Sequence, residues 1–274
     1  MNTHSTTLQF PCLAVLLGLV MGTPSLPAAD PPSATLRRDE FKMLVSADNT
    51  AQAIQALKLQ NPQASKQIIC FFDTPDQSLA AKHLILRGRQ TGPLPGESTV
   101  KIRDLLDETK LTAAERSIPI VWEWTSEALP IPSRSRDGSP LADGLVANAA
   151  AGKLPVTDLY NDEQRQLVSA RMGDFKWADL VCYGPVESLV WRRKWQAKGF
   201  PNKVTIELWL LRKDGKTLEL LELSAKANTT SEDQARALAK QFYAAAKAAG
   251  LGDPSGQMKT RMALDFFKPG LNHP

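Results

Sequence analysis

Short segments in which apolar and polar residues alternate recur along most of the chain. Alternation of this kind places successive side chains on opposite faces of a half-buried β-strand. Asp214-Gly215 is a strong signal for a tight hairpin turn between two of these segments. The predicted strands cover residues 40–45, 67–72, 83–90, 98–103, 118–125, 178–183, 187–195, 203–211 and 216–224.

Helical patterns are fewer. Asn161 and Ser231 each precede a glutamine by three residues, which is the spacing of a capping box at the start of a helix. Further helices are predicted near residues 50–59 and 141–151, the second within a connection rich in Pro, Gly, Ser and Ala that we interpret as an insertion, residues 126–159. With many strands and few helices, residues 37–268 predict a single α+β domain with a closed or nearly closed antiparallel sheet.

The N-terminal residues have a different pattern. Residues 10–20 form an apolar run that is short of the about 20 residues a membrane span requires. The small residues Ala28-Ala29 follow, so we expect a signal peptide over residues 1–29, a linker over 30–36 and export to a periplasmic or secreted location. Because no Lys or Arg precedes Arg37, an uncleaved anchor or an early start codon is the alternative. No later stretch predicts a transmembrane span.

The amino-acid composition argues against several kinds of functional site. Thirty-three Lys and Arg against 29 Asp and Glu give a net charge of +4, which is below what the basic surface of a nucleic-acid-binding protein requires. Of three histidines, only His83 is far from the chain ends, which argues against multi-histidine zinc sites and histidine relays. Glycine-rich nucleotide loops, the serine-hydrolase motif and paired C-x-x-C motifs are absent from the sequence. Cys70 and Cys182 lie in strand-like segments and are either buried thiols or a disulfide.

Charged residues spaced by two occur in several predicted strands and therefore share one face of the sheet. A solvated face of an antiparallel sheet shows the same alternation. The signs favour a different interpretation, because like charges opposite each other on neighbouring strands are destabilising and most of these residues are cations. A face that collects Lys and Arg is suited to phosphate oxygens. The spaced groups are Glu40 and Lys42, Arg87 and Arg89, Lys101 and Arg103, Arg192 and Lys194, and Glu222 with Lys226.

An ordered set of four segments carries a family resemblance. The segments are Glu40-Phe41-Lys42, Phe72-Asp73-Thr74-Pro75-Asp76, Leu86-Arg87-Gly88-Arg89 and Thr99-Val100-Lys101-Ile102-Arg103. In this order they resemble the N-terminal half of the CYTH domain, the triphosphate tunnel metalloenzyme superfamily. No segment is specific alone, and F-D-T-P-D is the most specific. The resemblance implies an eight-stranded antiparallel β-barrel whose tunnel binds triphosphates or other phosphoanhydrides with a divalent metal.

The resemblance also implies roles for individual residues. Lys42 and Arg87 are the candidates for catalysis. Phosphate contacts are implied for Lys42, Arg87, Arg89, Lys101 and Arg103, with Arg192 and Lys194 completing the basic wall. Ligands for Mg²⁺ or Mn²⁺ are expected among Glu40, Glu123, Glu207 and Glu222, since these hard cations prefer oxygen ligands.

Two departures from the family pattern shape the functional expectation. Arg38 stands where the family has the first glutamate of its opening motif, and Thr125 stands where a second acidic residue often follows Glu123. A weakened metal site leaves two hypotheses: a metal-dependent phosphohydrolase of a linear triphosphate or phosphoanhydride, or a non-catalytic exported module that binds anions or has a structural role. Export argues against a cyclase. Lys259-Thr260-Arg261 is interpreted as an exposed tail rather than as part of a tunnel mouth.

Overall fold

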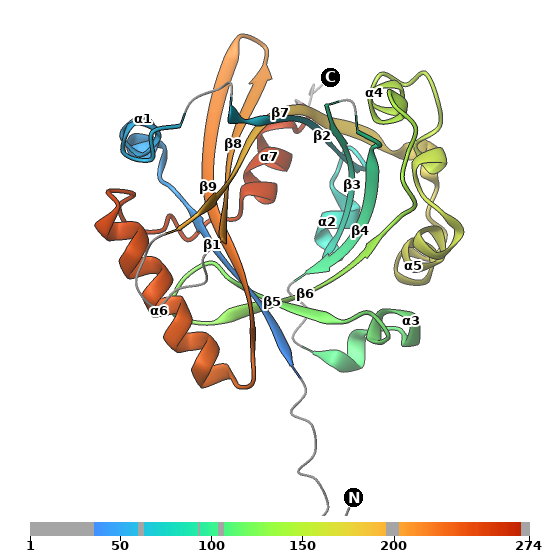
Figure 1. The fold of residues 1–274 in the computed structure, drawn as a ribbon. Helices are drawn as coiled ribbons and strands as arrows, with labels where there is room; N and C mark the ends of the chain where they lie inside the picture. The colour runs from blue at the N-terminus through green and yellow to red at the C-terminus, as the bar shows by residue number, and fades with distance from the viewer. Residues whose placement is uncertain (1–35, 60–62, 93, 104–106, 196–202, 270–274) are drawn as a thin grey trace, which may run out of the picture. The chain divides into compact units, whose positions relative to one another are not determined.

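The computed structural model describes residues 36–59, 63–92, 94–103, 107–195 and 203–269 (Figure 1). The predicted signal peptide, residues 1–29, and residues 30–35 of the predicted linker lie outside these ranges. Within them, nine strands close into one β-barrel accompanied by several helices. The expected α+β class with a closed sheet is confirmed. No helix in these ranges has the length and apolar character needed to cross a membrane.

The barrel differs from the expected one in strand number and direction. Its order is β1-β5-β6-β4-β3-β2-β7-β8-β9, and β9 closes the ring by pairing with β1. All neighbours are antiparallel except β1 and β5, which are parallel, so the expectation of eight antiparallel strands is wrong. The strands are β1 (Arg37–Leu44), β2 (Ser65–Asp73), β3 (Leu84–Thr91), β4 (Glu97–Arg103), β5 (Ile120–Trp124), β6 (Pro130–Asp137), β7 (Val181–Lys194), β8 (Lys203–Lys213) and β9 (Lys216–Thr229).

Strand β6 lies in the segment 126–159, which the sequence pattern predicts to be an insertion with one helix and no strand. Pro130 and Pro132 argue against a central strand because proline cannot donate to a β-ladder. In the described residues, β4 pairs with β6 only from Ser133 to Asp137, whereas both prolines pair with β5. The prolines therefore occupy a part of the strand that has a neighbour on one side, where a missing N–H is tolerated.

Strand β7 is one continuous strand where the sequence predicted two, 178–183 and 187–195. Gly184-Pro185 interrupts the alternation and is typical of a turn. The strand nevertheless runs through it, and its partner β2 shifts register between Ile69 and Phe71 at this point. The predicted hairpin between β8 and β9 is confirmed, with Asp214 and Gly215 both at positive φ.

The predicted helices are present, but α1 spans Ala47–Ala56 rather than 50–59, and α4 spans Leu145–Ala150 rather than 141–151. Asn161 accepts a hydrogen bond from the Gln164 N–H and Ser231 accepts one from the Gln234 N–H, so the cap residues of both helices are confirmed. Three helices were not predicted: the one-turn helices α2 and α3, and the longer α7. The helices are α1 (Ala47–Ala56), α2 (Ser78–Ala81), α3 (Ala113–Arg116), α4 (Leu145–Ala150), α5 (Asp162–Met172), α6 (Glu232–Ala248) and α7 (Lys259–Phe267).

The outer face of the barrel is covered by helices on two sides (Figure 1). Phe242 of α6 packs against Phe41 and Trp124, which face outward from β1 and β5. Val146 of α4 and Val168 of α5 pack in a second cluster over β2, β3 and β4. These apolar contacts stabilise the wall of the barrel and leave the opposite face of each strand for the interior.

Helix α7 lies inside the ring of strands (Figure 1). Its residues Ala263, Leu264 and Phe267 pack against side chains that point inward, among them Phe71 and Trp209. The side chain of Gln77 and that of Lys213 donate hydrogen bonds to backbone carbonyls at the C-terminal half of this helix. The expectation of an exposed tail beginning at Lys259 is therefore wrong, and α7 fills part of the barrel interior.

Cys70 and Cys182 are neighbouring thiols on β2 and β7 rather than a disulfide. Cys70 is buried and Cys182 is half-buried. The hydrogen bond between the two side chains, together with burial, raises the pKa of Cys70. Of the two possibilities left open by the sequence, the structure contains the reduced pair.

Candidate anion-binding cavity

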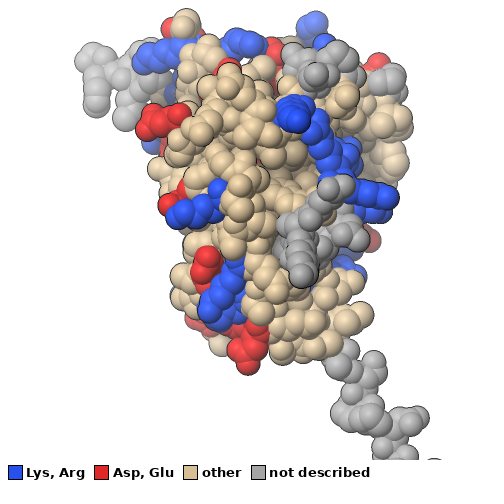
Figure 2. All heavy atoms as spheres, turned by 60° about the vertical axis from the view of Figure 1, so that its left-hand side comes forward, with Lys and Arg blue, Asp and Glu red and all other residues tan. Residues whose placement is uncertain are grey.

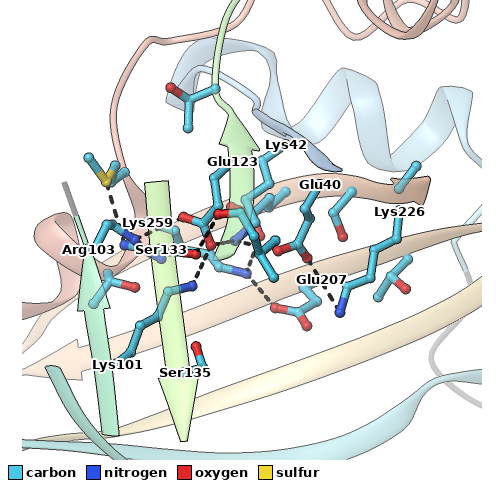
Figure 3. Close-up of a pocket in the computed structure, with 18 of the residues that line it drawn as sticks. Glu40, Lys42, Lys101, Arg103, Glu123, Ser133, Ser135, Glu207, Lys226 and Lys259 are labelled. Atoms are coloured by element: carbon cyan, nitrogen blue, oxygen red, sulfur yellow. Dashed lines mark hydrogen bonds and ion pairs between the residues drawn. The ribbon is translucent and has the colours of Figure 1, made fainter. Parts of the chain in front are cut away.

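The barrel interior contains a cavity of about 1160 Å³ (Figure 3). It is lined by residues from every strand of the barrel, and each of the eleven site residues expected from the sequence lines it. The lining includes twelve Lys and Arg but seven Asp and Glu. The charges spaced by two on separate strands thus meet in one enclosed space, which a solvated outer face would not produce.

Ten of the twelve lining cations fall into a largely buried group and an exposed group. Lys42, Arg87, Arg89, Lys101 and Arg103 have side chains that are between 12% and 29% exposed. The lining cations on the exposed part of the cavity are Arg38, Arg192, Lys194, Lys203 and Lys226. We call these five residues the basic rim. On the outer face drawn in Figure 2, small groups of basic and acidic side chains adjoin one another over a largely uncharged surface.

Glu123 is the centre of the buried group. Its side chain is 1% exposed and accepts a 2.8 Å hydrogen bond from Lys42 and a second hydrogen bond from Lys101. Arg103 places its Nε 2.9 Å from the other carboxylate oxygen. Glu40 is opposite Glu123 on the neighbouring strand and lies 3.1 Å from the Lys42 ammonium. Three cations therefore share two carboxylates, which leaves this group with one surplus positive charge.

The pKa values of the two lysines in this group are shifted in opposite directions. Burial lowers the pKa of Lys42, but Glu123 and Glu40 outweigh it and hold the pKa above its ordinary value. For Lys101, burial, Arg103 and Lys42 together outweigh Glu123 and lower the pKa to about 7. Burial would raise the pKa of Glu123, but Lys42, Arg103 and Lys101 hold it well below its ordinary value. The Lys101 ammonium therefore loses its proton near neutral pH unless a further anion stabilises the charged form.

Arg87 and Arg89 form a second basic pair on β3. Both contact one carboxylate, Glu97 on β4, with Arg87 at 3.2 Å. Arg87 also donates a 2.9 Å hydrogen bond to Thr99, whose hydroxyl donates to Asp137. The Nε atoms of Arg87 and Arg89 are buried and have no hydrogen-bond acceptor in the described residues. Buried donors of this kind cost free energy unless a ligand or water satisfies them.

The other two expected metal ligands lie on β8 and β9. Glu207 on β8 and Glu222 on β9 are directly opposite in the strand register. Lys259 of α7 bridges them, with its ammonium 2.9 Å from Glu222 and hydrogen-bonded to Glu207. Burial would raise the pKa of Glu207, but Lys259, Arg89 and Arg87 lower it to about 2. Both carboxylates are thus neutralised by groups of the protein itself.

The carboxylates do not form a metal site as they stand. Mg²⁺ requires near-octahedral oxygen coordination and Mn²⁺ also prefers oxygen ligands. In the described residues, no three Asp, Glu, His or Cys side chains are grouped so that they could hold a metal ion. Each of the four expected ligands instead contacts at least one lysine. The divalent metal implied by the family resemblance therefore does not fit this arrangement of donors.

No family model matches the sequence, and no curated protein matches it. Solved structures do match the fold. One is a Hippeastrum protein described as a provisional adenylyl cyclase with a dominant triphosphatase activity, with a TM-score of 0.53, 17% identity, and coverage of 82% of this chain and 94% of the other. Another is a Bacillus halodurans protein described provisionally as an adenylate cyclase, with a TM-score of 0.50, 14% identity, and coverage of 82% and 97%.

The chain has a CYTH-like fold. The barrel of these neighbours is reproduced over four fifths of the sequence, although the low identity means that the likeness establishes the fold alone. The resemblance found in the sequence is confirmed at this level. The roles of individual site residues are not established by the likeness and rest on the geometry of this chain.

The most specific motif of the CYTH-like resemblance lies outside the cavity. Asp73 of F-D-T-P-D is 2% exposed and accepts backbone hydrogen bonds from Thr74, Leu79 and Ala80, at 2.8, 2.9 and 3.0 Å. The Tyr183 hydroxyl donates a 2.7 Å hydrogen bond to the Thr74 carbonyl. The motif therefore fixes the turn that leads into α2 and does not contribute to the anion site.

Several charged lining residues were not assigned to the site from the sequence, among them Glu97, Lys203 and Lys259. Glu97 and Lys203 continue the alternation of β4 and β8, so extending the count of every second residue to the strand ends would have found them. Lys259 follows no such pattern. It enters the cavity because α7 folds back into the barrel, and this depends on tertiary packing rather than on local sequence.

Proposed function

We propose that this CYTH-like barrel binds a linear polyphosphate or the triphosphate group of a larger molecule in its basic cavity. The observation that carries the proposal is the convergence of five largely buried cations on one enclosed space, with two guanidinium Nε donors left unsatisfied. Burying so many like charges is costly unless anions compensate them. The carboxylates of the cavity compensate only part of this charge, and a multivalent anion would supply the rest.

The two kinds of cation suit different parts of such a ligand. The planar guanidinium groups of Arg87 and Arg89 match pairs of phosphate oxygens, whereas the ammonium groups of Lys42 and Lys101 act as point charges. The basic rim would attract a polyanion from solution, because a cleft lined by one sign of charge focuses the field. A chain of several phosphates could then contact the rim and the buried group at the same time.

Hydrolysis of the bound phosphoanhydride is the second candidate function. It is favoured by the Hippeastrum neighbour, whose description names a triphosphatase activity. Against it stands the donor set, because the carboxylates that would hold Mg²⁺ or Mn²⁺ are ion-paired with lysines. Lys42 and Arg87 would contact phosphate oxygens of the bound ligand and, if the ligand is hydrolysed, would stabilise the charge on the transferred phosphoryl group.

Isothermal titration calorimetry with tripolyphosphate tests the binding proposal. We expect binding that weakens with salt and that falls by about a hundredfold or more in Arg87→Ala/Arg89→Ala, because each charge-assisted hydrogen bond contributes about 1.5–3 kcal/mol. The matched control is Arg212→Ala/Arg261→Ala, which removes two exposed, ion-paired arginines that do not line the cavity. Absence of binding, or equal affinity in both double variants, would refute the proposal.

Phosphate release tests the second candidate. The protein is incubated with tripolyphosphate or nucleoside triphosphates in EDTA, Mg²⁺ or Mn²⁺, beside Arg87→Ala. Release that depends on Arg87 would establish an enzyme. Binding without release in any of these conditions would identify the chain as a binding module.

A further inference from the structure

The Lys259 side chain is buried in the interior of the barrel. Its side chain is 6% exposed, and its ammonium lies 4.1 Å from the centre of the Trp209 ring. The helix that carries it is anchored by Leu264 and Phe267, which are buried against the inward face of the strands. The ammonium is therefore a fixed charge of the cavity and not the end of a mobile side chain.

Glu207 and Glu222 need a cation between them. Two carboxylates in direct register on neighbouring strands repel each other, and both are largely withdrawn from water. Lys259 donates a hydrogen bond to Glu207, and its ammonium forms an ion pair with Glu222 at 2.9 Å, so one cation contacts both carboxylates. A divalent cation would have to displace this ammonium in order to reach the same oxygens.

We propose that Lys259 is a built-in cation that occupies the place of a divalent metal between Glu207 and Glu222, so that the cavity binds its polyphosphate ligand without a metal ion. The first half of this inference concerns the protein alone. The second half, metal-independent binding, rests on the proposed function. Lys259 then acts as a positioning residue that neutralises the acidic wall facing Arg87 and Arg89, both of which are close enough to affect the pKa of Glu207.

Removing the ammonium should create a metal site. In Lys259→Met, the Glu207 and Glu222 oxygens remain side by side with no positive partner from α7. Carboxylate oxygens in a polar cavity are ligands that Mn²⁺ binds, with water completing the coordination. The variant should therefore gain Mn²⁺ binding that the wild-type chain lacks, and Mn²⁺ should raise its melting temperature.

The experiment titrates Mn²⁺ in the absence of any anion, with free Mn²⁺ followed by electron paramagnetic resonance. We expect no stoichiometric binding by the wild type, one bound ion in Lys259→Met, and loss of that ion in Lys259→Met/Glu207→Gln/Glu222→Gln. The control is Arg261→Met, which removes an exposed cation from the same helix and should behave as the wild type. Stoichiometric Mn²⁺ binding by the wild type that Glu207→Gln/Glu222→Gln abolishes would overturn the inference, as would no gain in a folded Lys259→Met.

A second measurement needs no variant. Tripolyphosphate affinity of the wild type is compared in EDTA and in excess Mg²⁺. Because Mg²⁺ also chelates free tripolyphosphate, equal or lower affinity in Mg²⁺ supports metal-independent binding, and affinity that rises more than about tenfold with Mg²⁺ overturns it. If tripolyphosphate binds in neither condition, the proposed function and metal-independent binding fail, while the Mn²⁺ titrations still decide whether Lys259 occupies a metal position.

Discussion

Lys42 on β1 donates a 2.8 Å hydrogen bond to Glu123 on β5, and this contact links the two parallel neighbours of the barrel through their inward faces. Lys101 and Arg103 on β4, which β6 separates from β5, contact the same carboxylate. One buried anion thus holds cations from two strands that are not adjacent. The barrel interior depends on Glu123 for its charge balance, which makes this residue the most sensitive position of the site.

Glu123→Gln should destabilise the protein strongly. The substitution preserves shape but leaves Lys42, Lys101 and Arg103 with one fewer negative partner, and breaking a buried ion pair from one side costs about 3–5 kcal/mol. Urea unfolding followed by circular dichroism measures the loss. The control is Glu187→Gln, whose exposed pair with Arg212 should contribute less than about 1 kcal/mol. Equal stabilities of the two variants would contradict this account.

Anion affinity should fall as the pH rises through about 7, for a reason that lies in Lys101. In the free protein the pKa of Lys101 is about 7, because burial, Arg103 and Lys42 outweigh Glu123. An anion binds the protonated form, so above this pH binding must also take up a proton, and affinity falls by up to about tenfold per pH unit. Lys101→Arg keeps its charge throughout this range.

Comparing the wild type with Lys101→Arg separates the titration of Lys101 from that of the ligand. Tripolyphosphate itself titrates, but its titration contributes equally to the wild type and to Lys101→Arg. We therefore expect the ratio of wild-type to Lys101→Arg affinity to decrease from pH 6 to pH 9. Calorimetry in buffers of different ionisation enthalpy would detect the proton uptake directly, and parallel pH profiles would show that Lys101 is charged in the free protein.

The sequence predicted which charged residues lie together better than it predicted the strands of the barrel. Arg87 and Arg89, or Lys101 and Arg103, share a face in any strand, because the side-chain period of a strand is two residues. Like charges on neighbouring strands repel each other unless anions compensate them. Glu97 and Glu123 are the compensating anions in the cavity. A local rule and a simple electrostatic rule were therefore sufficient for this part of the site.

Other features depend on contacts that local pattern does not encode. Strand β6 could not be predicted from the sequence because it contains Pro130 and Pro132. A strand tolerates proline only where no neighbour needs its N–H, and this depends on the side on which the neighbouring strand lies. Gly184-Pro185 divides β7 in the sequence but not in the fold. Lys259 is one lysine among many in the sequence, and its burial follows from the docking of α7 inside the barrel. Each of these is decided by tertiary packing.

Asp73→Ala should lower stability while leaving anion affinity unchanged. The carboxylate satisfies three backbone N–H groups at the turn into α2, and their loss should cost about 1–3 kcal/mol. Because Asp73 does not line the cavity, tripolyphosphate affinity measured below the melting temperature should match the wild type. Asp76→Ala, at the exposed end of the same motif, is the control and should cost less. A large loss of affinity in folded Asp73→Ala would place the motif in the site after all.

The ion pair between Arg171 on α5 and Glu115 on α3 should stabilise the helices beside β4 and β6. Its two hydrogen bonds are 2.6 and 2.7 Å long, and the Glu115 side chain is fully buried. Arg171→Met leaves this carboxylate uncompensated and should cost about 3–5 kcal/mol. Arg171→Lys retains the charge but loses the two-pronged geometry, so its cost should be intermediate.

Two further variants separate the ion pair from general effects of substitution. Replacing both partners, as Glu115→Gln/Arg171→Met, should recover part of the stability lost in Arg171→Met, because no buried charge then remains unpaired. Arg261→Met removes an exposed i,i+4 pair with Asp265 and should change stability by less than about 0.5 kcal/mol. If the double variant is as unstable as the sum of its single substitutions, the two side chains are energetically independent and the contact does not hold α3 to α5.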